Sequence, residues 1–174
     1  MKLAGLISIA LATSTFAKPI KRALADYENV FNDISAQVAV VGGVVADYVG
    51  GSATADDVQD ASDLLVTTIN DGAAAIPGFA ALTNLEALSL VGPIQDLTAD
   101  VADLVDDVIA AEPNFIADGR EADVLASLNA QKAGAEAVRD AITPKVPAAL
   151  QDIAAELAQG IVTEIERGIA AYSN

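Results

Sequence analysis

The chain of 174 residues contains no cysteine, no histidine and no tryptophan. Without cysteine no disulfide can form, so the fold has to be stabilised by side-chain packing. The lack of both Cys and His also excludes thiol catalysis, Ser-His-Asp hydrolysis, haem ligation through His and the usual zinc sites. We therefore expect a protein that is not an enzyme, with no catalytic residue, no metal site and no cofactor.

Basic residues are scarce as well, with 9 Lys and Arg against 25 Asp and Glu and a net charge of −16. This charge disfavours binding to nucleic acid and to anionic membranes. Acidic residues cluster around Asp56-Asp57 and between Asp100 and Asp107. Their spacing places them opposite the apolar stripes of helices, so we interpret them as a solvated surface and not as a calcium or glycosidase site.

The first 17 residues, MKLAGLISIALATSTFA, have the basic start, apolar run and small-residue end of a secretory signal peptide cleaved after Ala17. Residues 18–22 end in the pair Lys21-Arg22, which predicts a dibasic processing site and a short pro-segment. Removal of both segments would leave 5 basic side chains and a net charge of −20. No later apolar run approaches the roughly 18 residues of a membrane span. We expect an extracellular, freely secreted protein without a transmembrane segment.

Apolar residues recur three and four apart in five stretches, and alanine fills much of the rest. The stripes run from Tyr27 to Tyr48, from Val58 to Ile76, from Ile94 to Val108, from Val124 to Ile142 and from Leu150 to Ile169. Glycine and proline separate them, and Glu112-Pro113 is expected to end the third stretch. We predict an all-α fold, an up-and-down bundle of about five amphipathic helices in one domain over residues 23–174, with the third helix broken near Gly92-Pro93.

The stripes consist mainly of Ala, Val, Ile and Leu, and only 3 Phe and 3 Tyr follow the signal peptide. Two interiors are compatible with this composition: the helices close tightly, or they leave a channel that an acyl chain fills. In the second case residues of all five stripes would bind the apolar ligand. These candidates are Val41, Val45, Leu65, Ile69, Leu97, Val101, Leu104, Val124, Leu128, Lys132, Leu150, Ile153, Leu157 and Ile161.

Lys132 is the polar member of this set, because Gln131-Lys132 interrupts the fourth stripe between Leu128 and Ala135. Two interpretations stay open. The side chain either extends to solvent along its own aliphatic stem, or it lies at the mouth of a cavity and pairs with a fatty-acid carboxylate.

Three sequence runs in the C-terminal half carry a resemblance. They are Leu125-Ala-Ser-Leu128-Asn-Ala-Gln-Lys132, then Ala141-Ile-Thr-Pro-Lys145-Val146-Pro147, and Ala155-Glu-Leu157 with Ile161. With them the chain, from about Ala23 to Tyr172, resembles the fungal hydrophobic surface binding protein A family, which includes the cell-wall galactomannoproteins. The resemblance implies a non-enzymatic, all-helical, secreted or cell-wall protein.

The same resemblance implies what the chain binds. Some members of that family bind fatty acids in a central cavity, and others adsorb to hydrophobic solids and help to bring a secreted esterase to them. We therefore expect a helical bundle that binds fatty acids, hydrophobic surfaces or both through its apolar interior. The alternative is a protein-interaction module that recruits a secreted esterase or acts on a host.

Overall fold

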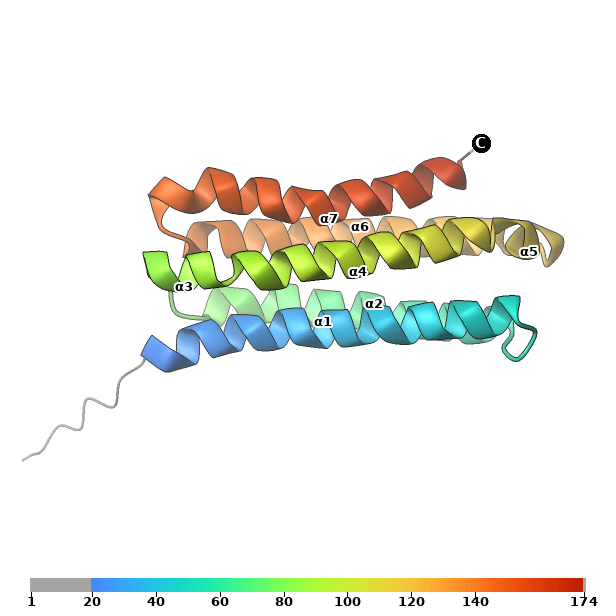
Figure 1. Ribbon diagram of the computed structural model, residues 1–174, viewed down its shortest axis with the longest axis horizontal. Helices are drawn as coiled ribbons and strands as arrows, with labels where there is room; N and C mark the ends of the chain where they lie inside the picture. The colour runs from blue at the N-terminus through green and yellow to red at the C-terminus, as the bar shows by residue number, and fades with distance from the viewer. Residues whose placement is uncertain (1–19, 174) are drawn as a thin grey trace, which may run out of the picture.

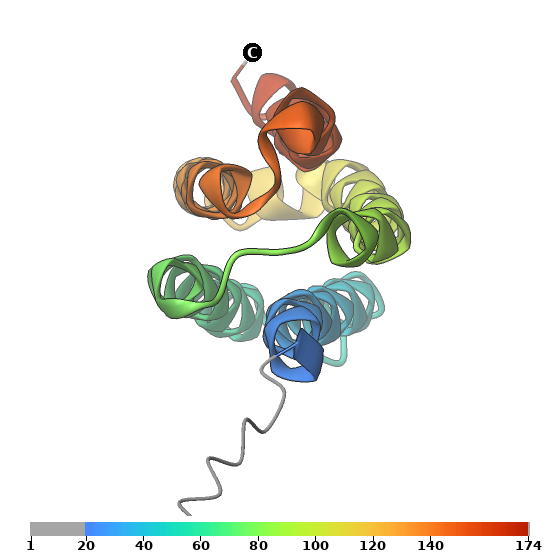
Figure 2. The same cartoon turned by 90° about the vertical axis from the view of Figure 1, so that its left-hand side faces the viewer.

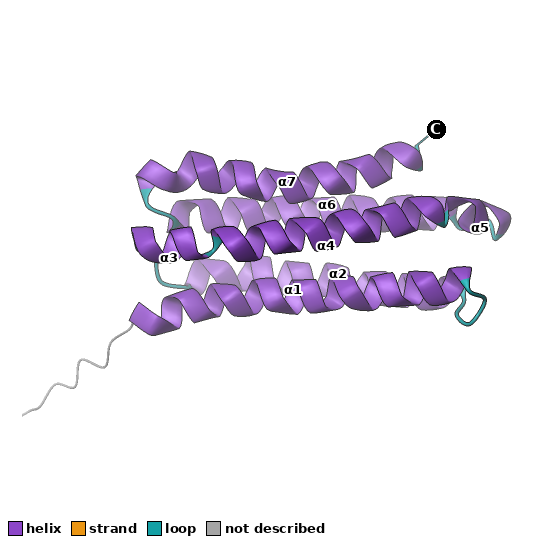
Figure 3. Cartoon of the chain, in the orientation of Figure 1, coloured by secondary structure: helices purple, strands orange, loops and turns teal. Residues whose placement is uncertain are grey.

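The computed structural model describes residues 20–173, and in this range the fold is all-α, as predicted, without a β-strand (Figure 3). The long helices are α1 (Ile20–Val49), α2 (Ala55–Ala75), α4 (Val91–Ala110), α6 (Glu121–Ile142) and α7 (Gln151–Ala171). The short elements are α3 (Asn84–Ser89), α5 (Glu112–Ala117), η1 (Ile76–Gly78), η2 (Thr143–Lys145) and η3 (Ala148–Leu150). The predicted signal peptide and its cleavage site at Ala17 lie outside the described residues, and Lys21 and Arg22 lie in the first turn of α1.

The five long helices form a closed ring. α1 packs against α2, α2 against α6, α6 against α7, α7 against α4, and α4 against α1. The view along the bundle shows these helices around a common axis (Figure 2). Helices that follow one another in the chain run in opposite directions, and the connections lie at the two ends of the bundle (Figure 1). The predicted up-and-down bundle is thus a five-membered ring.

The helix ends follow from local sequence. Gly51, at the end of α1, has a φ of 78°, a left-handed conformation that costs glycine no strain. Thr54 then caps α2, because its hydroxyl accepts from the backbone N–H of Asp57 while the Asp57 carboxylate accepts from the backbone N–H of Thr54. Gly119, with a φ of 68°, makes the corresponding turn before α6.

The predicted break in the third helix is present, and it lies at Leu90, between α3 and α4. Pro93 occupies the first turn of α4, where the N–H that it lacks would have no partner inside the helix. The break therefore precedes the proline by a few residues. The expected end of this element at Glu112-Pro113 is confirmed: α4 ends at Ala110, and Pro113 stands in the first turn of the separate short helix α5, which continues to Ala117.

The predicted stripes of the first three long helices are confirmed as core, with all seven residues of the first stripe buried from Tyr27 to Tyr48. The face of α7 differs from the prediction. Its buried residues are Ala158, Val162, Ile165, Gly168 and Tyr172, whereas Ile153 is 52% exposed. Gly168 faces α4 and α6, since a Cβ atom at this position would lie 3.3 Å from side-chain atoms of Val105 and Leu128.

One segment of α1, Ala23–Val49, is long and apolar enough to cross a membrane by length and composition alone. We had expected no segment to meet these criteria. The apolar stripe of α1 packs into the core of the bundle, and a helix at the core of a packed bundle meets the same two criteria.

Candidate apolar binding site

A ring of five helices leaves more space at its centre than a ring of four. With neighbouring axes about 9 Å apart, the centre of a regular five-membered ring lies about 8 Å from each axis. A helix with its side chains has a radius of about 5–6 Å. The difference of roughly 2 Å is close to the radius of a hydrocarbon chain. The topology itself therefore provides a channel, unless large side chains fill it.

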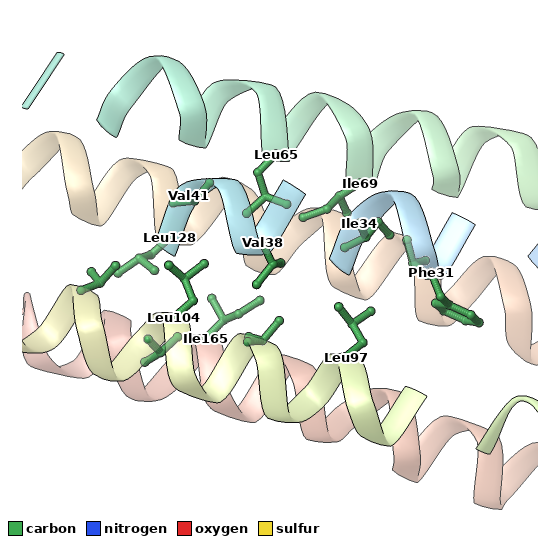
Figure 4. Packing of buried hydrophobic residues seen from close by; sticks show 14 of the residues in the cluster. Phe31, Ile34, Val38, Val41, Leu65, Ile69, Leu97, Leu104, Leu128 and Ile165 are labelled. Carbon is green, nitrogen blue, oxygen red and sulfur yellow. The ribbon is translucent and has the colours of Figure 1, made fainter. Parts of the chain in front are cut away.

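The structure contains a narrow hollow at this centre; its volume of about 1130 Å³ includes the gaps between the packed side chains and the openings to solvent. Its wall is mainly aliphatic and comes from all five long helices. Figure 4 shows this interior, with Val38 and Val41 from α1, Leu65 and Ile69 from α2, Leu97 and Leu104 from α4, Leu128 from α6 and Ile165 from α7. Of the two interiors that the sequence left open, the structure favours the channel, which is narrow.

Aromatic residues close the two ends of the bundle. Near the α1–α2 connection Phe115 stacks on Tyr48, with ring centroids 4.7 Å apart, and meets the edge of Tyr172 at 6.4 Å. Tyr48 donates to Asp118 over 2.8 Å, and burial, strengthened by this bond, raises the pKa of its hydroxyl to about 12. At the other end Tyr27 packs against Phe79 with centroids 5.1 Å apart. The few rings are therefore concentrated at the ends, and the middle is left to aliphatic side chains.

A polar strip interrupts the aliphatic wall where α2 and α6 meet. Gln59 Nε2 donates to Ser127 Oγ over 3.1 Å and to Asp63 Oδ1 over 2.9 Å. One turn further along the two helices, Ser62 and Gln131 also line the hollow, with only 6% and 7% of their surfaces exposed. Among residues 20–173 neither side chain has a hydrogen-bond partner. The amide of Gln131 lines the hollow without a partner among these residues, so Gln131 is suited to hold a polar group of a ligand.

The charged residues of the wall lie toward its two ends and are already paired. Arg120 forms ion pairs with Asp56 at 2.7 Å and with Asp123 at 3.0 Å. Arg139 contacts Asp140 at 2.9 Å and donates to Gln159 over 2.7 Å. In the described part of the chain no group of three acidic side chains is placed to hold a metal ion. The groups that remain for a ligand inside the hollow are the neutral donors of the polar strip.

Most of the predicted binding residues meet in this hollow, and the rest do not. Those that line it are Val41, Leu65, Ile69, Leu97, Val101, Leu104, Val124, Leu128 and Ile161. Val45 is buried, but it packs in the core beside the hollow. Leu150, Ile153 and Leu157 line a second, smaller groove of about 430 Å³ at the end of the bundle, between α3, the start of α4 and the start of α7.

Lys132 does not line the hollow. Its Nζ lies 2.6 Å from Glu166 of α7 and 3.9 Å from Glu136. Hydrogen bonding to Glu166 raises the pKa of Lys132 above its usual value, which holds the ammonium in its charged form. This position favours the first of the two interpretations, a side chain that extends along the bundle surface.

Sequence reasoning missed the polar strip. Gln131 was noticed only as an interruption of the fourth stripe, and Ser62, four residues after Val58, was not considered. The signal that could have identified both is their position: each is polar, yet stands in helical register with the buried residues of its own helix.

Comparison with known proteins agrees with the family resemblance seen in the sequence. A sequence model of the family described as hydrophobic surface binding protein A matches residues 24–144. Cell wall mannoprotein 1 of Aspergillus fumigatus is 39% identical over 165 residues, which cover 95% of this chain and 56% of that protein. The chain thus spans little more than half the length of this relative.

Two solved structures share the fold. Ligand binding domain 1 of the Penicillium marneffei MP1 protein, complexed with arachidonic acids, superposes with a TM-score of 0.82 at 25% identity, over 88% of this chain and 100% of that one. Ligand binding domain 2 of the same protein, complexed with multiple arachidonic acids, gives a TM-score of 0.82 at 28% identity, over 89% and 99%.

Proposed function

The chain belongs to the hydrophobic surface binding protein A family, and from this premise we propose that it binds a long-chain fatty acid in the hollow between its five long helices. The observation that carries the proposal is the combination of an aliphatic channel with one buried polar strip. A fatty acid has the same division into a long apolar part and a single polar group. Two structures of the same fold hold arachidonic acids, which supports this class of ligand.

The polar strip gives the ligand a direction. We place its carboxyl group beside Gln131 and Ser62, where the amide and the hydroxyl can each donate a hydrogen bond. From Gln131 back to Glu121, the first residue of α6, the helix extends over about 15 Å. The aromatic rings near Tyr48 partly close this end of the hollow. Toward Ile142 the wall extends for about 16 Å of helix and includes Phe31 and Arg139 beside its aliphatic residues. We place the acyl chain along this second stretch, from Gln131 toward Ile142, because Ile142 also lines the smaller groove and the apolar lining continues there.

Binding to water-repellent surfaces is the second candidate function. It is supported by the description of the family and by exposed apolar side chains such as Leu85, which is 75% exposed. Each apolar Å² removed from water contributes about 25 cal/mol, so contacts of a few hundred Å² suffice for adsorption. Recruitment of a secreted esterase, secretion, and attachment to the cell wall are further proposals that rest on the relatives.

We further propose that binding, and not catalysis, is the function of the domain. The family and its relative are named for surface binding and for the cell wall. The two predicted processing sites, at Ala17 and at Lys21-Arg22, stay part of this proposal, with residues 23–174 as the functional domain.

The test is a titration of the delipidated protein with palmitic acid, for the wild-type chain and for two variants that each gain one ring. Val101→Phe places the ring in the hollow, whereas Val40→Phe places it on the half-exposed outer face of α1. We expect tight binding by the wild type and by Val40→Phe, and a loss of at least about tenfold for Val101→Phe, because the ring occupies the space of several methylene groups. A wild-type protein that binds no fatty acid, or a Val101→Phe protein that binds as well as Val40→Phe, would contradict the proposal.

A further inference from the structure

The second groove differs from the rest of the surface in its lining. It is formed by Ala, Val, Leu and Ile side chains only, on a protein with 25 acidic residues. Two of its residues, Leu88 of α3 and Ile153 of α7, are 55% and 52% exposed. A concave lining made only of aliphatic side chains is suited to an apolar ligand group such as the end of a hydrocarbon chain.

This groove adjoins the central hollow. Ile94 of α4 and Ile142 of α6 line both spaces, so these two side chains form the wall between them. The two spaces therefore lie next to one another at these two side chains. The break at Leu90 lies directly beside this wall, since Leu90 and Val91 also line the groove.

The length of the hollow determines what reaches the groove. From Gln131 to Ile142 along α6 the distance is 11 residues, or about 16 Å. An extended lauroyl chain fits into this length, whereas the extended chain of behenic acid is considerably longer. If the carboxyl group is held at the polar strip, the methyl end of the longer acid has to fold back or pass between Ile94 and Ile142.

We propose that the groove between α3, α4 and α7 binds the methyl end of fatty acids that are too long for the central hollow, with Ile94 and Ile142 as the passage. This inference rests on the proposed function of the hollow and assigns a second compartment to the same ligand. The protein then binds long acyl chains along one continuous apolar path. The groove adds affinity only for acids whose chains reach it.

The experiment compares two double variants. In Leu88→Gln with Ile153→Gln the groove becomes polar at two half-exposed positions, where the substitution leaves the core intact. The control is Leu64→Gln with Val49→Gln, two residues of similar exposure that line neither space. Each delipidated protein is incubated with an equimolar mixture of lauric, palmitic and behenic acids, and native mass spectrometry gives the ratio of the complexes. Thermal unfolding checks that both variants are folded.

We expect the groove variant to lose about tenfold in the ratio of behenic to lauric complexes, since a few methylene groups lose an apolar environment. The control variant should keep the wild-type ratio. An unchanged ratio in the groove variant, or an equal loss for all three acids, overturns the inference while the proposed function stands. If the wild-type protein forms no complex with any of the acids, the proposed function fails and the inference fails with it.

Discussion

Gln59 of α2 donates a hydrogen bond to Ser127 of α6 over 3.1 Å, directly beside the central hollow. One turn further along α6, Gln131 is more deeply buried than Gln59, with 7% of its surface exposed, and its amide has no partner among the described residues. The first glutamine thus joins two helices. The amide of Gln131 has no partner within residues 20–173 of the empty bundle, and the carboxyl group of a ligand can supply one.

Replacement of Gln131 by leucine should change stability and affinity in opposite directions. We expect Gln131→Leu to stabilise the delipidated protein by about 1 kcal/mol, because an apolar side chain replaces a polar one in a mainly aliphatic wall. Its affinity for palmitic acid should fall about tenfold, because the carboxyl group loses a donor. Thermal unfolding and titration measure the two effects.

A second glutamine provides the matched control. Gln37 Nε2 is also buried without a hydrogen bond, but Gln37 does not line the hollow. Gln37→Leu should therefore stabilise the protein to a similar extent and leave the affinity unchanged. Equal affinities of the two variants would remove Gln131 from the binding site.

The close contact of α2 with α6 depends on Gly134. A Cβ atom at this position would lie 2.7 Å from Cγ2 of Ile69, which is attached directly to the stiff Cβ of the isoleucine. We expect Gly134→Ala to destabilise the protein by about 1–3 kcal/mol, measured by chemical denaturation, because the helices are forced apart. At Gly160 the nearest atom, Cγ2 of Thr98, would be 3.5 Å away, so Gly160→Ala should be neutral or stabilising. Equal effects of the two substitutions would argue against the close packing.

The helices could be predicted from the sequence because the residues of each buried face belong to one continuous segment. Tyr27, Phe31 and Ile34 recur at helical spacing, and this spacing alone places them on one face. Capping by Thr54 and the break before Pro93 are equally local, since they depend on residues within one turn.

The hollow could not be predicted in the same way, because it depends on which helices become neighbours. Periodicity shows that Leu65 and Leu104 face inward, but not that a ring of five keeps them apart. Ile153 shows the same limit: it continues the apolar stripe of α7, yet it lies at the end of the bundle, where no long helix covers it.

Asp57 should make the protein sensitive to acid. Hydrogen bonds from the side chain and the backbone of Thr54 hold the pKa of Asp57 below its usual value. Because the folded pKa is the lower one, this contribution to stability is present above the unfolded pKa, about 4, and is lost as the pH falls through the folded pKa. The Tm of Asp57→Asn should lie below that of the wild type at pH 7, and the difference should shrink in acid. A difference that is constant with pH would contradict this role.

Lys132 should not contribute to fatty-acid binding. Its ammonium lies 2.6 Å from Glu166 on the surface between α6 and α7, outside the lining of the hollow. We expect Lys132→Ala to bind palmitic acid with unchanged affinity, measured by the same titration. A clear loss of affinity would instead support the interpretation in which this lysine pairs with the carboxylate of the ligand.

Adsorption to an uncharged hydrophobic solid should increase as the pH falls from 7 to about 4, the range in which carboxyl groups become protonated. At neutral pH the net charge of −16, or −20 after the predicted processing, makes neighbouring molecules repel one another on the surface. Protonation weakens this repulsion, whereas the apolar contact with the solid does not depend on pH. Added salt screens the same repulsion, so the pH dependence should flatten at high ionic strength. Adsorption measured on polystyrene beads that is constant or rises with pH would show that charge does not limit the process, and that opening of the bundle or another step controls it.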